Sequence, residues 1–98
     1  MKKIVEIIAI QSFYITCKFN DGRIISLNVK PLLDNQQFLQ GIEKLYDETI
    51  FKKVRTGKMG ELVWDNITTT IYNNEQAVWN YDISPELAWS LGNTYLVS

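Results

Sequence analysis

Apolar and polar residues alternate along the first third of the chain in the pattern of β-strands. Residues 4–10 are mostly β-branched and apolar, which predicts a strand that is covered on much of both faces. Residues 13–19 alternate cleanly between apolar and polar side chains, and residues 23–29 predict a third strand with one apolar face. Pro31 ends this strand, because proline cannot donate a hydrogen bond to a β-ladder.

The loop between the second and third strands can be assigned from the side chains that each register would pair. A two-residue turn would place Cys17 opposite Ser26 and mix apolar with polar side chains. A three-residue loop over residues 20–22 places Cys17 opposite Ile25 and gives one apolar face. We therefore predict this longer loop, with Gly22 in the left-handed conformation. The same register pairs Ile15 with Leu27, and Phe13 with Val29.

The middle of the chain carries weaker helical signals. Asp34 has the character of a helix cap, and Gln37 three residues later completes a pair that is typical of a capping box. Apolar residues then recur at helical spacing over residues 38–46. Gly41 weakens this helix by roughly 1 kcal/mol relative to alanine, so a short or irregular helix is expected. Residues 47–53 predict another helical turn, anchored by Phe51.

The second half of the chain predicts more strands. A turn is expected between Gly57 and Gly60, followed by one strand at residues 61–65 and another at 68–72. Asn73, Asn74 and Glu75 predict a turn, and residues 76–81 predict the next strand, with Ala77, Trp79 and Tyr81 on one face.

A short helix is predicted near the end of the chain. Ser84 offers a capping hydroxyl, Pro85 suits the first helical position, and Glu86 places an acid in the first turn. Gly92 is well placed to end this helix. The order of elements predicts an α+β fold with a small, largely antiparallel sheet, and the length predicts a single domain over residues 1–98.

Charge and composition narrow the possible functions. The chain of 98 residues has a net charge of −1, and its basic residues are scattered, so direct binding to nucleic acid is not expected. No apolar run reaches the length of a membrane span and no signal peptide is recognisable, which predicts a cytoplasmic protein without a membrane partner. Cys17 is the one cysteine, and its apolar strand pattern predicts a buried core residue.

The sequence offers little catalytic chemistry. It contains no histidine, and one cysteine is too few for a zinc site, so we expect no enzyme, no cofactor and no metal. Phosphate-binding and dinucleotide-binding loops are also absent. A pair formed by Asp65 and Asp82 near aromatic residues could support glycoside hydrolysis. We favour structural roles for both, with Asp65 in a strand-end turn and Asp82 helping to cap the last helix.

Aromatic residues are concentrated in the second half of the chain and provide the candidate interaction surface. Tryptophan and tyrosine are enriched at binding hot spots, but they also fill cores, and the core interpretation is favoured with at least one tryptophan partly exposed. The candidate surface consists of Trp64, Trp79, Tyr81, Asp82 and Trp89.

Several short motifs resemble the DUF2442 family of small bacterial proteins. They are an opening strand at residues 5–10, the hairpin at residues 19–23, its exit at 29–33, the Phe-x-x-Val element at 51–54, and the ending from Val78 to Leu87. The resemblance implies a compact α+β domain of unknown function. Some relatives precede a DNA-binding helix-turn-helix, which this chain lacks, and others are encoded beside a small toxin-like protein.

Three functions remain open from the sequence. The leading hypothesis is a non-enzymatic interaction or regulatory module, the antitoxin-like partner of another small protein. The alternative is a small-ligand sensor with a cleft lined by Trp64, Trp79 and Tyr81. A carboxylate-dependent enzyme is the third. A homodimer is also a hypothesis, because edge strands in so small a sheet need to be covered.

Overall fold

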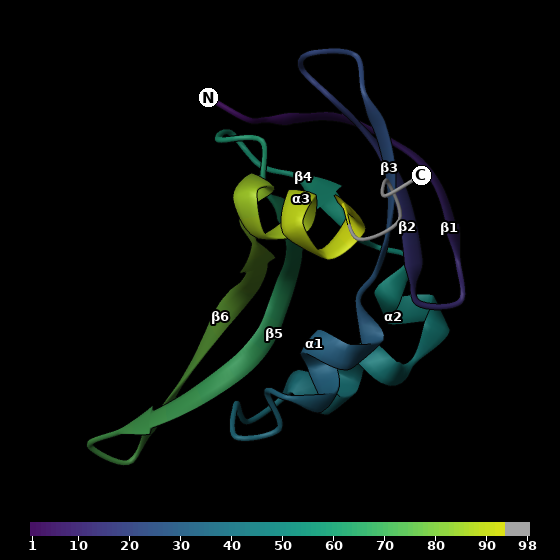
Figure 1. Cartoon of the computed structure of the whole chain (residues 1–98). Helices are drawn as coiled ribbons and strands as arrows, with labels where there is room; N and C mark the ends of the chain where they lie inside the picture. Colours follow the sequence, from purple (N-terminus) through teal and green to yellow (C-terminus); the bar gives the residue numbers. More distant parts are fainter. Residues whose placement is uncertain (94–98) are drawn as a thin grey trace.

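The protein has an α+β fold with two three-stranded antiparallel sheets, as a computed structural model that describes residues 1–93 shows (Figure 1). The predicted α+β class and N-terminal meander are confirmed, although the strands form two sheets. Residues 94–98 of the predicted domain lie outside the described part. The first sheet has the order β1 (Ile4–Gln11), β2 (Tyr14–Phe19) and β3 (Ile24–Asn28). The second has the order β4 (Arg55–Thr56), β5 (Leu62–Tyr72) and β6 (Glu75–Ile83).

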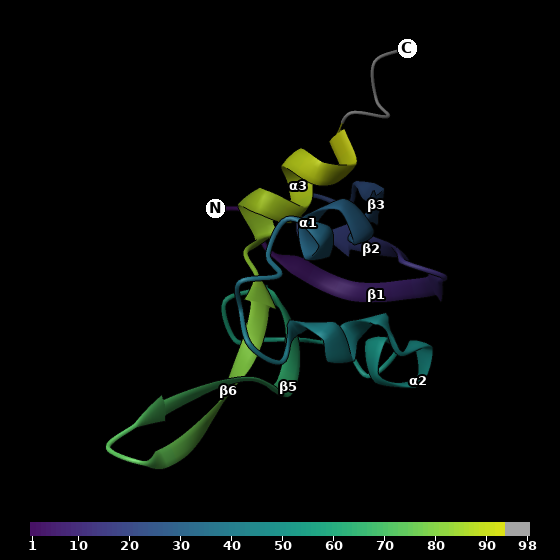
Figure 2. The same ribbon diagram turned by 90° about the horizontal axis from the view of Figure 1, so that it is seen from below.

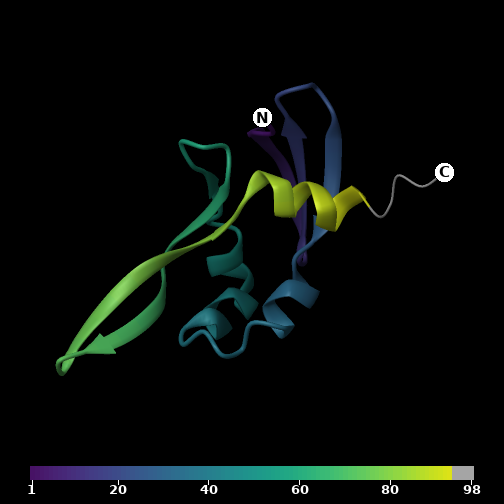
Figure 3. The ribbon, with the colours of Figure 1, turned by 60° about the vertical axis from the view of Figure 1, so that its left-hand side comes forward.

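Four short helical segments connect and cover the sheets. They are α1 (Lys30–Asp34), the 3-10 helix η1 (Ile42–Tyr46), α2 (Glu48–Phe51) and α3 (Pro85–Asn93). Helix α3 packs against β3, and Figure 3 shows it crossing the first sheet. In Figure 1 the segment from α1 to α2 lies below α3, at the lower end of the first sheet.

The predicted register of the β2–β3 hairpin is confirmed. Cys17 pairs with Ile25 and Ile15 pairs with Leu27. Gly22 has a φ of +91°, the left-handed conformation that the three-residue loop requires. Beyond the strands, the Val29 N–H donates to the Phe13 carbonyl at 2.9 Å, so the third expected pair is also adjacent.

Strand β1 is not covered on both faces, so that prediction was wrong. Val5 and Ile8 are 55% and 45% exposed. Both residues lie where the register with β2 shifts, so neither has a partner in the ladder. Only Ile4 of this strand is fully buried, because β1 is an edge strand whose outer face has no covering layer.

The predicted capping box at Asp34 is also wrong. Asp34 is the last residue of α1, and the helix that was expected over residues 38–46 is reduced to η1. Gly41 explains the interruption, because its φ is +100° and an added Cβ would lie 2.2 Å from the Ile67 carbonyl oxygen. The following helical turn is confirmed: Asp47 accepts a hydrogen bond from the Thr49 N–H, and Phe51 is fully buried.

Residues 61–65 and 68–72 belong to one strand rather than two. Strand β5 continues through an irregularity between Trp64 and Thr68, where Asn66 takes a φ of +57°. The Asn80 side chain of β6 accepts the Asn66 N–H at 3.0 Å and stabilises the bulge. The bulge interrupts the alternation of apolar residues, which made the sequence resemble two strands. The predicted turn before this strand is confirmed by a 3.0 Å hydrogen bond from Gly60 N–H to the Gly57 carbonyl.

Helix α3 begins as predicted but does not end at Gly92. The Ser84 hydroxyl accepts the Leu87 N–H at 3.1 Å, so Ser84 is the cap, whereas Asp82 lies within β6. Gly92 is inside the helix, where an added Cβ would lie 1.9 Å from a methyl group of Ile25. Its small size therefore serves close packing of α3 on β3.

The core lies where the inner face of the first sheet meets α3, the base of β5 and β6, and the helical segments. Cys17 is fully buried there, which confirms its predicted role. No charged or polar residue is buried among residues 1–93. The largest fully buried side chains are those of Trp64, Phe19, Phe51, Ile15, Leu27, Leu33, Ile42, Leu45, Leu62 and Ile83.

Candidate interaction surface

The outer part of the β5–β6 hairpin, residues 68–79, projects from the rest of the protein, and we call it the arm. Figures 2 and 3 show it extending away from the helices and the first sheet. Asn73 and Asn74 form its two-residue loop, with φ values of +52° and +64°. Such a loop matches the natural twist of two strands. The arm makes the protein elongated, with extents of 50 × 24 × 21 Å.

Large apolar side chains are exposed on both faces of the arm. Tyr72 and Trp79 are 77% and 55% exposed, and the cross-strand pairing places them on one face. Ile71 and Val78 are 68% and 49% exposed on the other face. The Trp79 indole N–H donates to the Thr70 hydroxyl at 2.8 Å, which holds the ring flat along the arm.

The arm carries almost no charge. Glu75 is the only ionisable acid or base among residues 68–79 apart from the Tyr72 phenol. Exposed strands usually carry charged residues, lysine above all, that prevent pairing with other chains. The arm therefore combines exposed apolar surface with an absence of the usual protection.

The two edges of the arm differ. The outer edge of β5 is partly occupied, because the Thr69 N–H donates to the Gln40 carbonyl at 2.9 Å and the Lys44 ammonium donates to the Ile67 carbonyl at 3.2 Å. Strand β6 is last in its sheet, and within residues 1–93 no strand pairs with its outer edge. The arm thus offers two apolar faces and one free edge.

Trp64 and Tyr81, two of the predicted surface residues, lie in the core. They are 1% and 6% exposed, and their rings contact each other with centroids 5.8 Å apart. The Trp64 indole donates to the Phe51 carbonyl at 2.9 Å, and the Tyr81 hydroxyl donates to the Gln36 side chain. Burial, and to a smaller extent the charge of Asp82, raise the pKa of Tyr81 to about 12.

Trp79, Asp82 and Trp89 reach the surface at separate places. Trp79 lies on the arm, Asp82 is exposed at the base of β6, and Trp89 is half-buried on α3. The structure therefore does not bring the five predicted residues onto one surface. Trp64, Trp79 and Tyr81 likewise form no open cleft, because two of them are buried.

Trp89 lines an open hollow beside the N-terminus. Its ring packs edge-to-face on Phe19, and the Lys2 ammonium and Arg23 guanidinium lie 5.0 and 5.4 Å from the ring centroid. These contacts attach the first residues to α3. The hollow has a volume of about 590 Å³, and both acidic and basic side chains line it. Its lining consists of Met1, Lys2, Asn20, Asp21, Arg23, Glu86 and Trp89.

The two carboxylates considered for catalysis are placed differently. Asp65 lies within β5, not in a strand-end turn, and binds Arg55 through two hydrogen bonds of 2.8 and 2.9 Å. The Arg55 guanidinium lowers the pKa of Asp65, so this carboxylate stays ionised and paired. Asp82 is exposed on β6, where it faces Val63 across the sheet.

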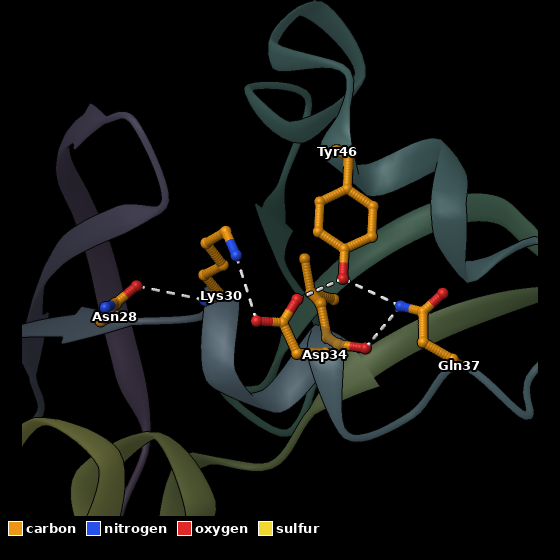
Figure 4. A network of polar contacts seen from close by, with 6 residues as sticks. Asn28, Lys30, Asp34, Gln37 and Tyr46 are labelled. Atoms are coloured by element: carbon orange, nitrogen blue, oxygen red, sulfur yellow. Dashed lines mark hydrogen bonds and ion pairs between the residues drawn. The ribbon is translucent and has the colours of Figure 1, made fainter.

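A polar network joins α1 to η1 (Figure 4). The Tyr46 hydroxyl donates to Asp34 at 2.5 Å, and Lys30 forms an ion pair with the same carboxylate at 3.1 Å. The Tyr46 hydrogen bond, followed by that of Lys30, lowers the pKa of Asp34. Gln37 donates to both Tyr46 and the Leu33 carbonyl, so each polar group serves to hold these segments together.

Sequence reasoning missed three of the four apolar side chains exposed on the arm: Ile71, Tyr72 and Val78. The signal that could have found them is a pair of alternating, nearly uncharged segments on either side of Asn73 and Asn74. Both faces of such a hairpin contain apolar residues, and a chain of this length has too few elements to cover both.

Comparison with known proteins identifies no relative. No protein-family model, no curated protein and no solved structure matches the chain. The resemblance to the DUF2442 family therefore stays a prediction. In the described residues, no group of three or more acidic or cysteine side chains could hold a metal ion. None of the helices within residues 1–93 is long and apolar enough to cross a membrane.

Proposed function

We propose that the protein is a non-enzymatic interaction module that binds another small protein through the faces of its arm. The proposal rests on one observation. The arm projects from the rest of the protein, which we call the body, and it exposes the side chains of Ile71, Tyr72, Val78 and Trp79. A two-stranded hairpin is only marginally stable when both of its faces meet water. A partner that covers the arm would remove this exposure.

The exposed apolar surface is large enough to contribute to binding. The exposed fractions correspond to roughly 300 Å² for Tyr72 and Trp79 on one face and roughly 200 Å² for Ile71 and Val78 on the other. The aromatic face therefore reaches the lower end of the range of about 300–600 Å² that holds for the largest apolar patches on monomers, which are often functional. Tyr72 and Trp79 belong to the residue types that dominate binding hot spots. Because the arm has a single charge, the partner surface is expected to be apolar and uncharged.

The resemblance to the DUF2442 family supports a regulatory role of this kind. Its motifs occupy structural positions in this chain: Phe51 and Ile83 are buried, and Ser84 caps α3. Most of the motifs lie outside the arm, and the last one begins within it, at Val78 and Trp79. An antitoxin-like protein needs a stable body and an exposed binding element, and the arm supplies the second.

Binding can be tested with an arm variant and a matched control. The Tyr72→Ser/Trp79→Ser variant removes the two aromatic rings of one face, and Ile24→Ser removes a side chain that is 57% exposed on the first sheet. Proteins captured from native cells by each bait are identified by quantitative mass spectrometry, and the best candidate is purified and titrated calorimetrically. We expect the arm variant to weaken binding at least tenfold and the Ile24→Ser variant to bind normally.

The same titration defines the outcome that contradicts the proposal. Equal affinity of the wild-type protein and the arm variant would exclude the aromatic face of the arm as the binding element. Recovery of no protein except the bait itself would count against an interaction module altogether. Far-UV circular dichroism of both variants verifies that a loss of binding is not a loss of fold.

A further inference from the structure

Within residues 1–93, the outer edge of β6 carries backbone groups that no other strand pairs with. β6 is the last strand of the second sheet, and its only strand partner is β5. The stretch from Gln76 to Tyr81 contains no proline and no charged side chain, and the extra residues of the bulge opposite Trp79–Tyr81 belong to β5. Natural edge strands are usually protected by at least one of these features. β6 is therefore competent to pair with a further strand.

The hairpin loop determines which residues of β6 point their backbone groups outward. A two-residue loop makes Tyr72 and Glu75 a hydrogen-bonded pair, and hydrogen-bonded and non-hydrogen-bonded pairs then alternate along the ladder. The N–H and C=O groups of Gln76 and Val78 consequently face outward. Thr69, which pairs with Val78, agrees with this assignment because its N–H points outward to Gln40.

We propose that β6 pairs antiparallel with β6 of a second copy of this chain, with Val78 opposite the partner's Val78. This dimer deepens the proposed function and rests on the same open arm, but it uses the edge of the arm rather than its faces. Continuing the alternation makes Asn80 the third outward residue. A two-fold axis at Val78 also places Gln76 opposite the partner's Asn80, so outward residues meet only outward residues.

Geometry and charge both exclude a shift of this register by one residue. A shift of one residue would place outward groups opposite inward ones and break the ladder. The same shift toward the base would bring Glu75 opposite the partner's Asp82, two like charges that repel. In the Val78-centred register Glu75 lies opposite the partner's Tyr81 instead. Each body then lies beyond the tip of the partner's arm.

The resulting four-stranded sheet has two continuous faces. Trp79 of each copy lies opposite Ala77 of the other, and these residues lie on the same face because cross-strand neighbours share a face. The interface would bury roughly 700 Å² in total, which falls in the range of weak, reversible complexes. We therefore expect a dimer that forms in the micromolar range and that presents one aromatic face, with Tyr72 and Trp79 of both copies, to a larger partner.

The dimer can be tested with a proline at the centre of the edge. Val78→Pro removes an N–H that has no acceptor in the described part of the chain, so the hairpin tolerates it, whereas the dimer loses its central hydrogen bonds. Val78→Thr is the matched control, because it keeps the N–H and the β-branched shape. Sedimentation velocity from 1 µM to 1 mM should show a monomer–dimer equilibrium for the wild-type protein and for Val78→Thr, and monomer throughout for Val78→Pro.

A crosslinking experiment tests the register independently of proline. A Val78→Cys variant places two thiols across the two-fold axis at a Cα separation of about 5.5 Å, which a disulfide can span. The native Cys17 is fully buried and does not compete. Mild oxidation should give a covalent dimer for Val78→Cys and mainly monomer for Ile71→Cys, a more exposed site on β5. Equal crosslinking at both sites would overturn the register.

The outcomes separate this inference from the proposed function. A wild-type protein that stays monomeric at 1 mM, or a Val78→Pro variant that dimerises normally, overturns the β6 dimer and leaves partner binding by the arm faces intact. If the protein dimerises but the Tyr72→Ser/Trp79→Ser variant binds the partner as tightly as the wild-type protein, the proposed function is contradicted and the β6 dimer still holds.

Discussion

Small side chains determine how closely α3 approaches the first sheet. Ala88 is fully buried, and Gly92 leaves so little space that an added Cβ would lie 1.9 Å from the Ile25 Cγ2 atom. Ile25 is itself 3% exposed and has little freedom to move. Packing, rather than helix termination, therefore explains the glycine at this position.

Gly92→Ala should destabilise the protein despite improving the helix. Alanine gains about 1 kcal/mol of helix propensity over glycine, but overpacking a filled core costs about 1–3 kcal/mol and forces Ile25 to shift. We expect a net decrease in the free energy of unfolding, measured by urea denaturation. The exposed Ser90→Ala on the same helix should change it by less than about 0.5 kcal/mol. A more stable Gly92→Ala protein would contradict the close contact.

Cys17 makes the stability of the protein sensitive to alkaline pH. Burial raises the pKa of its thiol from 9.0 to about 11 in the folded protein. A group whose pKa is raised by folding contributes full stability below its unfolded pKa and loses that contribution as the pH approaches the folded pKa. The loss should therefore begin near pH 9 and be complete above pH 11.

The alkaline effect can be isolated by comparing two proteins at two pH values. Between pH 7.5 and pH 10 the wild-type protein should lose about 1 kcal/mol more unfolding free energy than Cys17→Ala. Lysine and tyrosine residues titrate in both proteins, so their contributions cancel in the difference. Identical pH profiles would show that Cys17 ionises as readily in the folded state as in the unfolded one.

The element that most distinguishes this fold is the long, bent β5. Its base carries Trp64 into the core, and its outer half forms the arm with β6. The bulge around Asn66 marks the change between these two environments. The arm therefore contributes few buried contacts to the body, although it belongs to the same strands.

Removing the arm should leave the body folded. We predict that replacing residues 69–78 with Asn-Gly, so that Thr68 and Trp79 close a shorter hairpin, changes the unfolding free energy by less than about 2 kcal/mol, since a two-stranded hairpin adds little stability of its own. Near-ultraviolet circular dichroism should retain the signals of the packed Trp64 and Trp89. Loss of a cooperative urea transition would show that the arm is part of the folding core.

At the scale of the whole molecule, Trp64 connects the second sheet to the helical segment. Its indole N–H donates to the Phe51 carbonyl at 2.9 Å, and its ring contacts the rings of Phe51 and Tyr81. Phe51 in turn packs edge-to-face on Phe13, beside the first sheet. Trp64 is thus part of a continuous aromatic cluster between the two sheets.

The same replacement at Trp64 and at Trp79 should lower the free energy of unfolding by very different amounts. Trp64→Phe removes the shorter of two hydrogen bonds to the Phe51 carbonyl, which keeps only the Val54 N–H at 3.3 Å, and it creates a small cavity. We therefore expect a loss of about 2–4 kcal/mol of unfolding free energy. Trp79→Phe changes an exposed ring and should cost less than about 1 kcal/mol. Urea denaturation followed by far-ultraviolet circular dichroism avoids relying on tryptophan emission. Similar losses in both variants would contradict the different burial of the two rings.

The features that the sequence predicted correctly depend on neighbouring residues. The register of the β2–β3 hairpin followed from the pairing of Cys17 with Ile25, and the start of α3 followed from the Ser84 hydroxyl. In both cases the interacting groups are close in the chain, so local pattern and turn chemistry are sufficient. The burial of Cys17 followed from the same alternation.

The candidate site was only partly predictable from the sequence. The alternation of apolar and polar residues shows which side chains share a face of a strand, but it does not show how far along the strand the core covers that face. Trp79 and Tyr81 share a face of β6, yet Tyr81 is buried against Trp64 and Trp79 is exposed two residues further along. Likewise, Asp34 has the sequence of a cap but ends α1 and binds Tyr46. Pattern along the chain thus determined the strands, the hairpin register and the last helix, whereas the tertiary structure alone decided which aromatic residues the core covers, since burial depends on segments distant in sequence.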